Sequence, residues 1–202
     1  LLKIGSLKTI IQKTEKDGNK KNTVKSFDLN PSQKIIIITV KENLQNNSLE
    51  NTGSIFYDHI KANKIYNLSI VLPENSKIDL SEFLHGAKLK SYEFNIYKSS
   101  KKEQLYNINV ISNKNLSNTK SKLNKLQSLE KGVFYTRDLV SEPGNILHPD
   151  EYTKRLIKLK KFGLKVTVYD EKKLKKLGCN ALLGVGQGSI RGSYLVTIEW
   201  KG

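Results

Sequence analysis

The stretch RDLVSEPGNILHPDEY, residues 137–152, constrains the fold of this chain more than any other part of the sequence. It places two prolines, a glycine and an asparagine between two segments with helical patterns. Pro143 disfavours helical geometry at the residue before it, while Gly144 and Asn145 suit a turn. We therefore predict that a long helix over about residues 117–142 stops here, and that a non-helical corner follows it.

A second helix is predicted to start at the far end of this stretch. His148 takes the capping position, and Pro149 occupies the first helical residue, where its missing N–H costs nothing. Asp150 and Glu151 place negative charge on the positive end of the helix dipole. The predicted buried stripe is formed by Tyr152, Leu156 and Leu159, and the predicted end is Gly163.

The segment before about residue 115 is predicted to form an α/β domain. Its apolar run KIIIITV, residues 34–40, predicts a buried strand because β-branched side chains suit a sheet. The polar segments 13–34 and 41–54 predict loops and turns. The opening residues LLKIGSLKTIIQK predict a first strand or helix, since a targeting leader would carry a small-residue cleavage site.

Strands and helices then alternate in the sequence, which is typical of an α/β layer. A short helix through Ile60 precedes a strand over residues 65–72, and LYNINVIS, residues 105–112, predicts another strand. An amphipathic helix capped by Asp79 or Ser81 lies between these two strands. Its apolar positions are Leu80, Phe83, Leu84, Ala87 and Tyr92.

The rear of the chain predicts the beginning of a second α/β domain. LKVTVYD is a strand, DEKKLKKLG is a short helix capped by Asp170 and closed by Gly178, and YLVTIEW is a strand, which together suggest a βαβ-like unit. The long helix before the corner is predicted to face inward with Leu123, Leu126, Leu129, Val133 and Val140. The predicted domains are therefore residues 1–115, a connecting helix and corner over 116–148, and residues 149–202.

Composition limits the class of protein. The net charge is +16, with 32 Lys against 3 Arg. A solvated lysine coat and a functional anion-binding surface both remain open, because charge speaks to partners and not to fold. The longest apolar run, residues 35–38, is far short of the roughly 18 residues of a membrane span, so no membrane role is expected. The single cysteine, Cys179, excludes an internal disulfide and fits a reducing cytosol.

No motif in the sequence assigns catalytic chemistry. GVGQGS, residues 184–189, lacks the final glycine of a dinucleotide fingerprint and the lysine of a P-loop, so close backbone approach explains its glycines better. Ser189 is not in a nucleophile elbow. His59, His85 and His148 are scattered without a positioned nucleophile. We therefore assign no catalytic, metal-binding or substrate-binding residue.

The corner stretch TRDLVSEPGNILHPDEY resembles the segment that joins the two domains of the leucyl (cytosol) aminopeptidase family. That segment typically reads Arg-Asp-Leu, then Asn-Glu-Pro-x-Asn, then Thr-Pro and an acidic pair. The matching positions are Arg137, Asp138, Leu139, Glu142, Pro143, Asn145, Pro149 and Glu151. Three further stretches are also similar to the family over residues 83–202: FLHGAKLKSYEFNIYKSSKK, LKVTVYDEKKLKKLGCNALLGVGQGS and the strand YLVTIEWKG, which carries the family's EW-x-G.

This sequence departs from the family pattern at several positions. Ser141 replaces the usual asparagine, and His148 replaces the threonine that would complete a capping box. Gly144 and the pair Cys179-Asn180 also differ from the usual residues. Loss of the threonine cap is expected to cost about 0.5–2 kcal/mol of stability.

The resemblance implies a fold and an activity. It implies a macro-domain-like amino-terminal α/β domain, a connecting helix and a catalytic α/β domain, in a cytoplasmic homohexamer that removes amino-terminal residues from peptides. Two divalent metal ions, manganese, zinc or magnesium, would activate the attacking water. In the family, the metal-binding carboxylates and lysine follow the EW-x-G strand. The metal-binding segment is thus expected beyond residue 202, and this chain alone is predicted to be inactive.

Two further hypotheses come from other classes of function. Some bacterial members of the family bind DNA, and the basic amino-terminal domain makes DNA a second candidate partner. A macro-like domain could also bind ADP-ribose, although residues 1–115 lack a convincing phosphate loop. We also expect Arg137 to serve as a charged anchor at the corner.

Overall fold

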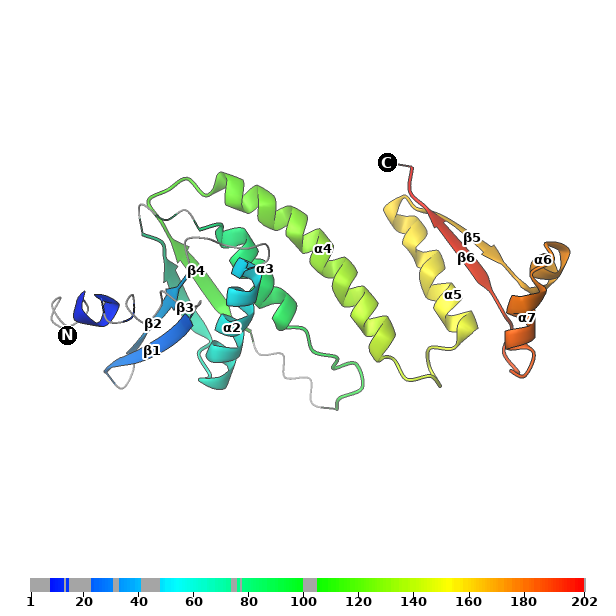
Figure 1. Ribbon diagram of the computed structural model, residues 1–202, viewed down its shortest axis with the longest axis horizontal. Coiled ribbons are helices and arrows are strands. Elements are labelled where there is room, and N and C mark those ends of the chain that lie inside the picture. Colours follow the sequence, from blue (N-terminus) through cyan, green and yellow to red (C-terminus); the bar gives the residue numbers. More distant parts are fainter. Residues whose placement is uncertain are drawn as a thin grey trace. The chain divides into compact units, whose positions relative to one another are not determined.

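The computed structural model describes residues 8–12, 14, 23–30, 33–40, 48–73, 76, 78–99 and 105–201. Its backbone divides into two compact units, unit 1 (Leu1–Thr136) and unit 2 (Arg137–Gly202) (Figure 1). The described part of the chain forms three two-stranded sheets and a set of helices, so the α/β class predicted from the sequence is confirmed. The predicted domain boundaries at residues 115 and 148 stay predictions.

Unit 1 contains an antiparallel hairpin. Strand β1 (Thr23–Asn30) pairs with β2 (Gln33–Thr39), and the register shifts near the turn, between Asp28 and Asn30. The predicted isoleucine strand is confirmed, but its isoleucine side chains are half-buried and not fully buried. The predicted loop over 13–34 is wrong for residue 14, which is helical, and for residues 23–30 and 33–34, which lie in β1 and β2. Residues 13, 15–22 and 31–32 lie outside the described residues.

Helix α2 (Ser48–Ala62) begins earlier than the sequence pattern indicated. The predicted turn region 41–54 is wrong from residue 48 onward, while residues 41–47 lie outside the described part. The buried positions of α2 are Leu49, Thr52, Gly53, Phe56, Tyr57 and Ile60. Their three- and four-residue spacing is helical, but Thr52 and Gly53 are not apolar, which hides the stripe from a search for hydrophobic residues.

Two parallel strands of unit 1 are joined by a helix, as predicted. Strand β3 (Asn67–Val71) pairs in parallel with β4 (Asn107–Ile111), and α3 (Leu80–Lys90) lies between them in the sequence. Alternate side chains of both strands are half-buried. Leu68, Ile70, Ile108 and Val110 pack against the core cluster, so this β-α-β segment supplies one wall of the core.

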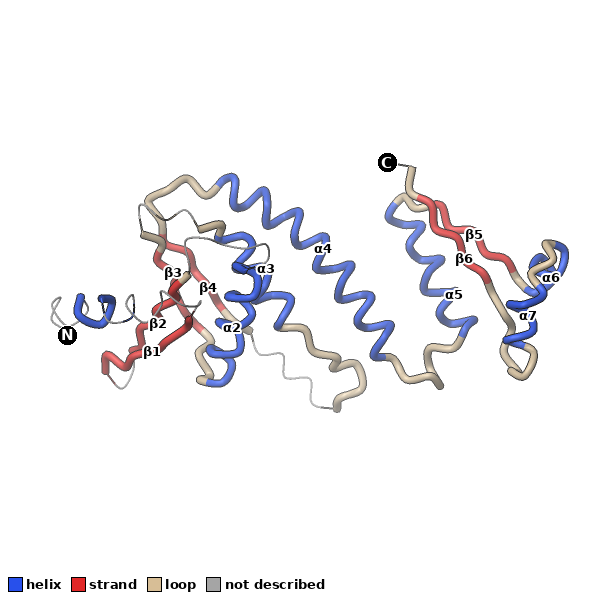
Figure 2. The backbone as a smooth tube through the Cα atoms, viewed as in Figure 1, coloured by secondary structure: helices blue, strands red, loops and turns tan. Residues whose placement is uncertain are grey.

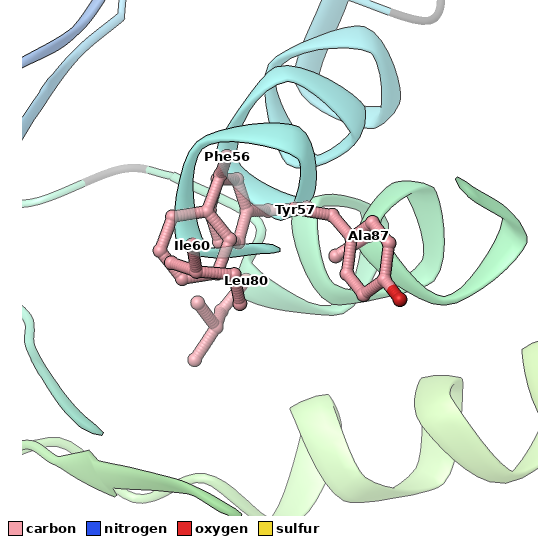
Figure 3. Close-up of a cluster of buried hydrophobic side chains, with 6 residues drawn as sticks. Phe56, Tyr57, Ile60, Leu80 and Ala87 are labelled. Atoms are coloured by element: carbon pink, nitrogen blue, oxygen red, sulfur yellow. The ribbon is translucent and has the colours of Figure 1, made fainter. Parts of the chain in front are cut away.

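The core of unit 1 lies where α2 and α3 meet. Its buried members are Phe56, Tyr57, Ile60, Leu80, Phe83 and Ala87. Figure 3 shows five of these side chains labelled, extending from the two helices toward one another. The rings of Phe56 and Phe83 have centroids 5.1 Å apart, and half-buried residues of β1, β2, β3 and β4 pack around the cluster.

The amino-terminal end of α3 is capped as predicted. Asp79 accepts hydrogen bonds from the backbone N–H of Ser81, at 3.0 Å, and from the Ser81 hydroxyl. Lys122 of α4 (Ser117–Ser141) forms an ion pair with the same carboxylate. Burial by itself would raise the pKa of Asp79, but the hydrogen bonds from Lys122 and Ser81 outweigh it and lower that pKa.

The long helix α4 confirms the predicted helix over 117–142, but its buried face differs. Leu123, Leu126 and Val133 are half-buried as expected. Leu129 and Val140 are wrong, since they are 56% and 81% exposed. Apart from half-buried positions, the one buried residue on this helix is Glu130, which the apolar pattern did not include.

The elements of unit 2 follow the order predicted from the sequence, and two of its helical segments end at glycines. It contains α5 (Pro149–Ile157), a 3-10 turn η1 (Lys158–Phe162), β5 (Lys165–Tyr169), α6 (Glu171–Lys176), α7 (Asn180–Gly186) and β6 (Leu195–Glu199) (Figure 2). Gly163 and Gly178 have φ of 83° and 74°, a left-handed conformation that glycine adopts without strain. Both predicted helix ends are confirmed.

The sheet of unit 2 differs from the predicted βαβ-like unit. Strands β5 and β6 pair antiparallel, with Val166 opposite Ile198 and Lys165 opposite Glu199. Two short helices connect them, so the chain reverses direction and does not make a parallel crossover. The face bearing Val166 is the buried one, and Tyr152 of the predicted α5 stripe is 43% exposed.

Candidate functional site

The corner between α4 and α5 is the feature that the sequence singled out, and the structure confirms the break. Helix α4 ends at Ser141 and α5 begins at Pro149. Between them the N–H groups of Ile146 and Leu147 both donate to the carbonyl of Pro143, at 2.9 Å. The corner is therefore a hydrogen-bonded turn and not a continuous helix.

His148 caps α5 as predicted from the sequence. Its Nδ1 accepts a hydrogen bond from the backbone N–H of Glu151 at 3.4 Å, and Pro149 occupies the first helical turn. The same Nδ1 lies 2.5 Å from Oδ1 of Asp150. A ring nitrogen cannot accept and donate at once, so Nδ1 either accepts from the Glu151 N–H or carries a hydrogen and donates to Asp150.

Arg155 links the corner to α5 through hydrogen bonds, and the sequence patterns did not predict this role. Its Nη1 donates to Oε1 of Glu142 at 2.8 Å, and its Nε donates to Oε1 of Glu151 at 3.2 Å. The Glu142 side chain is only 2% exposed, so the carboxylate that precedes Pro143 is buried against a guanidinium. The bond to Glu142 is the main cause of a raised pKa at Arg155. The four-residue spacing of Glu151 and Arg155 is the sequence feature that could have indicated their ion pair.

The loop after α7 is attached to two other elements of unit 2. Arg191 Nη1 lies 3.3 Å from Oδ2 of Asp150, and the N–H of Ser193 donates to Oε1 of Glu171 at 3.0 Å. A Cβ built on Gly186 would lie 1.9 Å from Oγ of Ser193. The predicted close backbone approach is not found at Gly184 and Gly188, where a Cβ would meet nothing within 4 Å, and the neighbour at Gly186 is a side-chain hydroxyl and not backbone. The stretch is not all loop, because α7 runs through Gly186.

The remaining singled-out residues lie apart from this corner. His59 is half-buried on α2, His85 is buried on α3, and Cys179 is half-buried before α7. Arg137 is exposed near the end of α4, and its role as an anchor stays a prediction. The structure therefore gathers neither the histidines nor the cysteine into one catalytic arrangement.

The described residues do not fit a metal centre. Among them there is no group of three or more His, Cys, Asp or Glu side chains able to hold an ion. Glu50, His85 and Glu130 do lie together, but the two carboxylates contact different nitrogens of one ring and do not converge on a point. Among the described residues no helix is both long and apolar enough to cross a membrane.

Comparison with known proteins shows that the corner lies in a segment that matches a peptidase family. Residues 134–202 match the family model described as the cytosol aminopeptidase family, catalytic domain. A probable cytosol aminopeptidase of Phytoplasma mali is 43% identical over 132 residues, which cover 63% of this chain and 26% of that protein. One from Brucella melitensis biotype 1 is 35% identical over 192 residues, covering 89% of this chain and 39% of that protein.

Solved structures share the fold. A tomato leucine aminopeptidase mutant superposes with a TM-score of 0.77 at 18% identity, covering 96% of this chain and 41% of that one. The bottromycin maturation enzyme BotP in complex with Mn gives a TM-score of 0.69 at 17% identity, covering 93% of this chain and 42% of that one. At these identities the likeness shows the fold alone.

These findings show that the chain is a mixed α/β segment with the fold of the aminopeptidase structures. The chain belongs to the cytosol aminopeptidase family, and the resemblance noted in its sequence is confirmed. It spans about a quarter to two fifths of the length of the curated relatives described above.

Proposed function

We propose that these 202 residues are the amino-terminal portion of a metal-dependent leucyl-type aminopeptidase that releases amino-terminal residues from peptides. The observation that carries the proposal is the match over residues 134–202, which runs from the end of α4 through the corner and all of unit 2. The confirmed break at Pro143 supports it, because the sequence resemblance rests on that corner.

The proposal includes two divalent metal ions, manganese, zinc or magnesium, in the intact enzyme. In the family, their ligands belong to segments that follow the strand corresponding to β6. The presence of Mn in the structure of BotP supports a divalent ion in this class of fold. When bound, such ions would activate the attacking water and polarise the scissile carbonyl.

The partners and location proposed for the intact enzyme follow from the family. They are peptides with a free amino terminus, five further copies of the same chain in a homohexamer, and the cytoplasm. The names of the relatives, cytosol aminopeptidases, support the peptide substrate and the location. The names of those relatives give no support to the DNA-binding alternative.

We expect the 202-residue chain alone to release no p-nitroaniline from leucine p-nitroanilide in the presence of Mn²⁺. The reason is that, in the family, the ligands of the two metal ions follow the strand that corresponds to β6. The assay should include the Phytoplasma mali relative as a positive control and circular dichroism to show that the chain is folded. Turnover of the chain at a rate like that of the relative would contradict this part of the proposal.

A further inference from the structure

Helix α7 and the loop after it carry apolar side chains that nothing in unit 2 covers. Residues 178–190 form the longest stretch of the sequence without a charged side chain, in a chain with 27% charged residues. None of the 7 residues of α7 is buried, and Val185 is 91% exposed. Ile190, in the loop, is 100% exposed. A helix with this composition is normally buried against a neighbour, so its exposure indicates a surface that another element covers.

Four exposed side chains gather on this short part of the chain. Leu182 and Val185 are three residues apart and therefore lie on the same face of α7. Leu177, at the end of α6, is 61% exposed, and α6 packs beside α7 (Figure 1). We call Leu177, Leu182, Val185 and Ile190 the α7 surface.

The loop that carries Ile190 is fixed on both sides of this residue. The N–H of Ser189 donates to the carbonyl of Gly186 at 3.0 Å, and the N–H of Arg191 donates to Oγ of Ser189 at 3.0 Å. The guanidinium of Arg191 pairs with Asp150. The exposed isoleucine is thus held in one place, which lowers the entropy that a partner has to remove on binding.

We propose that the α7 surface docks on an apolar surface, bordered by carboxylates, in the portion of the aminopeptidase that follows β6 in the relatives. This inference rests on the proposed function. Unit 2 matches a family model described as a catalytic domain, and the aligned part of this chain covers only 39% of the Brucella melitensis relative. The rest of that relative is long enough to supply the apolar side chains that would cover α7.

The charges beside α7 favour this occupant over a second copy of the chain. Helix α6 carries Lys172, Lys173, Lys175 and Lys176, and all four are exposed. Two copies that met through the α7 surface would bring these lysines together, and like charges across an interface are unfavourable. A partner surface with carboxylates at its border has the complementary charge.

The docking surface predicts a difference between this chain alone and this chain inside a complete enzyme. The complete enzyme is a chimera in which residues 1–202 replace the matching portion of the Brucella melitensis relative. We expect the amides of α7 to exchange hydrogen at least about tenfold more slowly in the chimera than in the 202-residue chain. The reason is that burial of one leucine or valine side chain opposes local opening by this order.

Substitutions in the α7 surface should act in the chimera alone. Val185→Lys and Ile190→Lys should leave the urea midpoint of the 202-residue chain unchanged, because both side chains are exposed there. In the chimera each should lower the urea midpoint and return the exchange of α7 toward the rate in the 202-residue chain, since burying an unpaired lysine is costly. Leu105→Lys is the control, because it adds the same charge at a residue of unit 1 that is 72% exposed.

The docking surface is excluded if α7 exchanges equally fast in the 202-residue chain and in a folded chimera, even one that releases leucine. It is also excluded if Val185→Lys costs the chimera no more than Leu105→Lys. Protection of α7 that rises with the concentration of the 202-residue chain alone would identify a second copy as the occupant and overturn the proposal. Leucine release tests the proposed function separately, so protection of α7 in a chimera that releases no leucine supports the docking surface and contradicts that function.

A second measurement decides the matter if the chimera does not fold. Lysine is then placed in the intact Brucella melitensis relative, at the position aligned with Val185. A lower urea midpoint of that variant supports the docking surface, and an unchanged midpoint overturns it.

Discussion

Replacing Gly53 or Gly86 by alanine is expected to destabilise unit 1 by about 3 kcal/mol, at the upper end of the usual cost of overpacking. A Cβ on Gly53 would lie 1.9 Å from the carbonyl oxygen of Phe83, and one on Gly86 would lie 1.9 Å from that of Glu50. Both obstacles are backbone atoms, so α2 and α3 would have to move apart. The core cluster between them would open as a result, and urea unfolding of each variant measures the loss.

Gly132→Ala is the matched control for these two variants. Gly132 lies within α4, and a Cβ built on it would meet nothing within 4 Å. Alanine there should stabilise the helix by roughly 0.5–1 kcal/mol, because glycine loses more backbone freedom on folding. Equal effects at Gly53, Gly86 and Gly132 would show that the close approach of α2 and α3 is not what the glycines provide.

Arg155→Met is expected to destabilise unit 2 by about 3 kcal/mol, the cost of breaking a buried ion pair by removing one partner. Methionine keeps much of the volume of the side chain but cannot donate to Glu142, whose carboxylate is 2% exposed. The corner should then loosen, and hydrogen exchange at the amides of Ile146 and Leu147 should accelerate.

Lys165→Met serves as the control for Arg155→Met. Lys165 pairs with Glu199 across β5 and β6, and both side chains are more than two fifths exposed. An exposed pair of this kind contributes about 0–1 kcal/mol. The assignment of Arg155 to the corner would be wrong if Arg155→Met cost no more than Lys165→Met, or if amides 146 and 147 exchanged at unchanged rates.

Local backbone chemistry made the corner predictable from the sequence. Pro143 limits the residue before it and Pro149 suits the first turn of a helix, and both constraints act within a few residues. The glycines at 163 and 178 and the caps at Asp79, His148 and Asp170 are signals of the same local kind. These elements were placed correctly because nothing distant is needed to explain them.

The elements that were missed depend on partners far away in the sequence. β1 is polar and becomes a strand by pairing with the isoleucines of β2. The start of α2 is buried through Thr52 and Gly53, and Gly53 fits against the backbone of α3 because it has no side chain. Glu130 is buried where its carboxylate forms a hydrogen bond with His85, and Arg155 donates a hydrogen bond to Glu142. The periodicity of apolar residues along the sequence predicts none of these contacts.

The most direct measurement of the proposed function uses a chimera in which residues 1–202 replace the matching portion of the Brucella melitensis relative, which aligns over 192 residues. Leucine release from a peptide in the presence of Mn²⁺ is compared between the chimera and that relative. If this chain is the amino-terminal portion of such an aminopeptidase, the chimera should retain activity within about tenfold, or about 1.4 kcal/mol of activation free energy. A folded chimera that releases no leucine above the metal-free background would contradict the account.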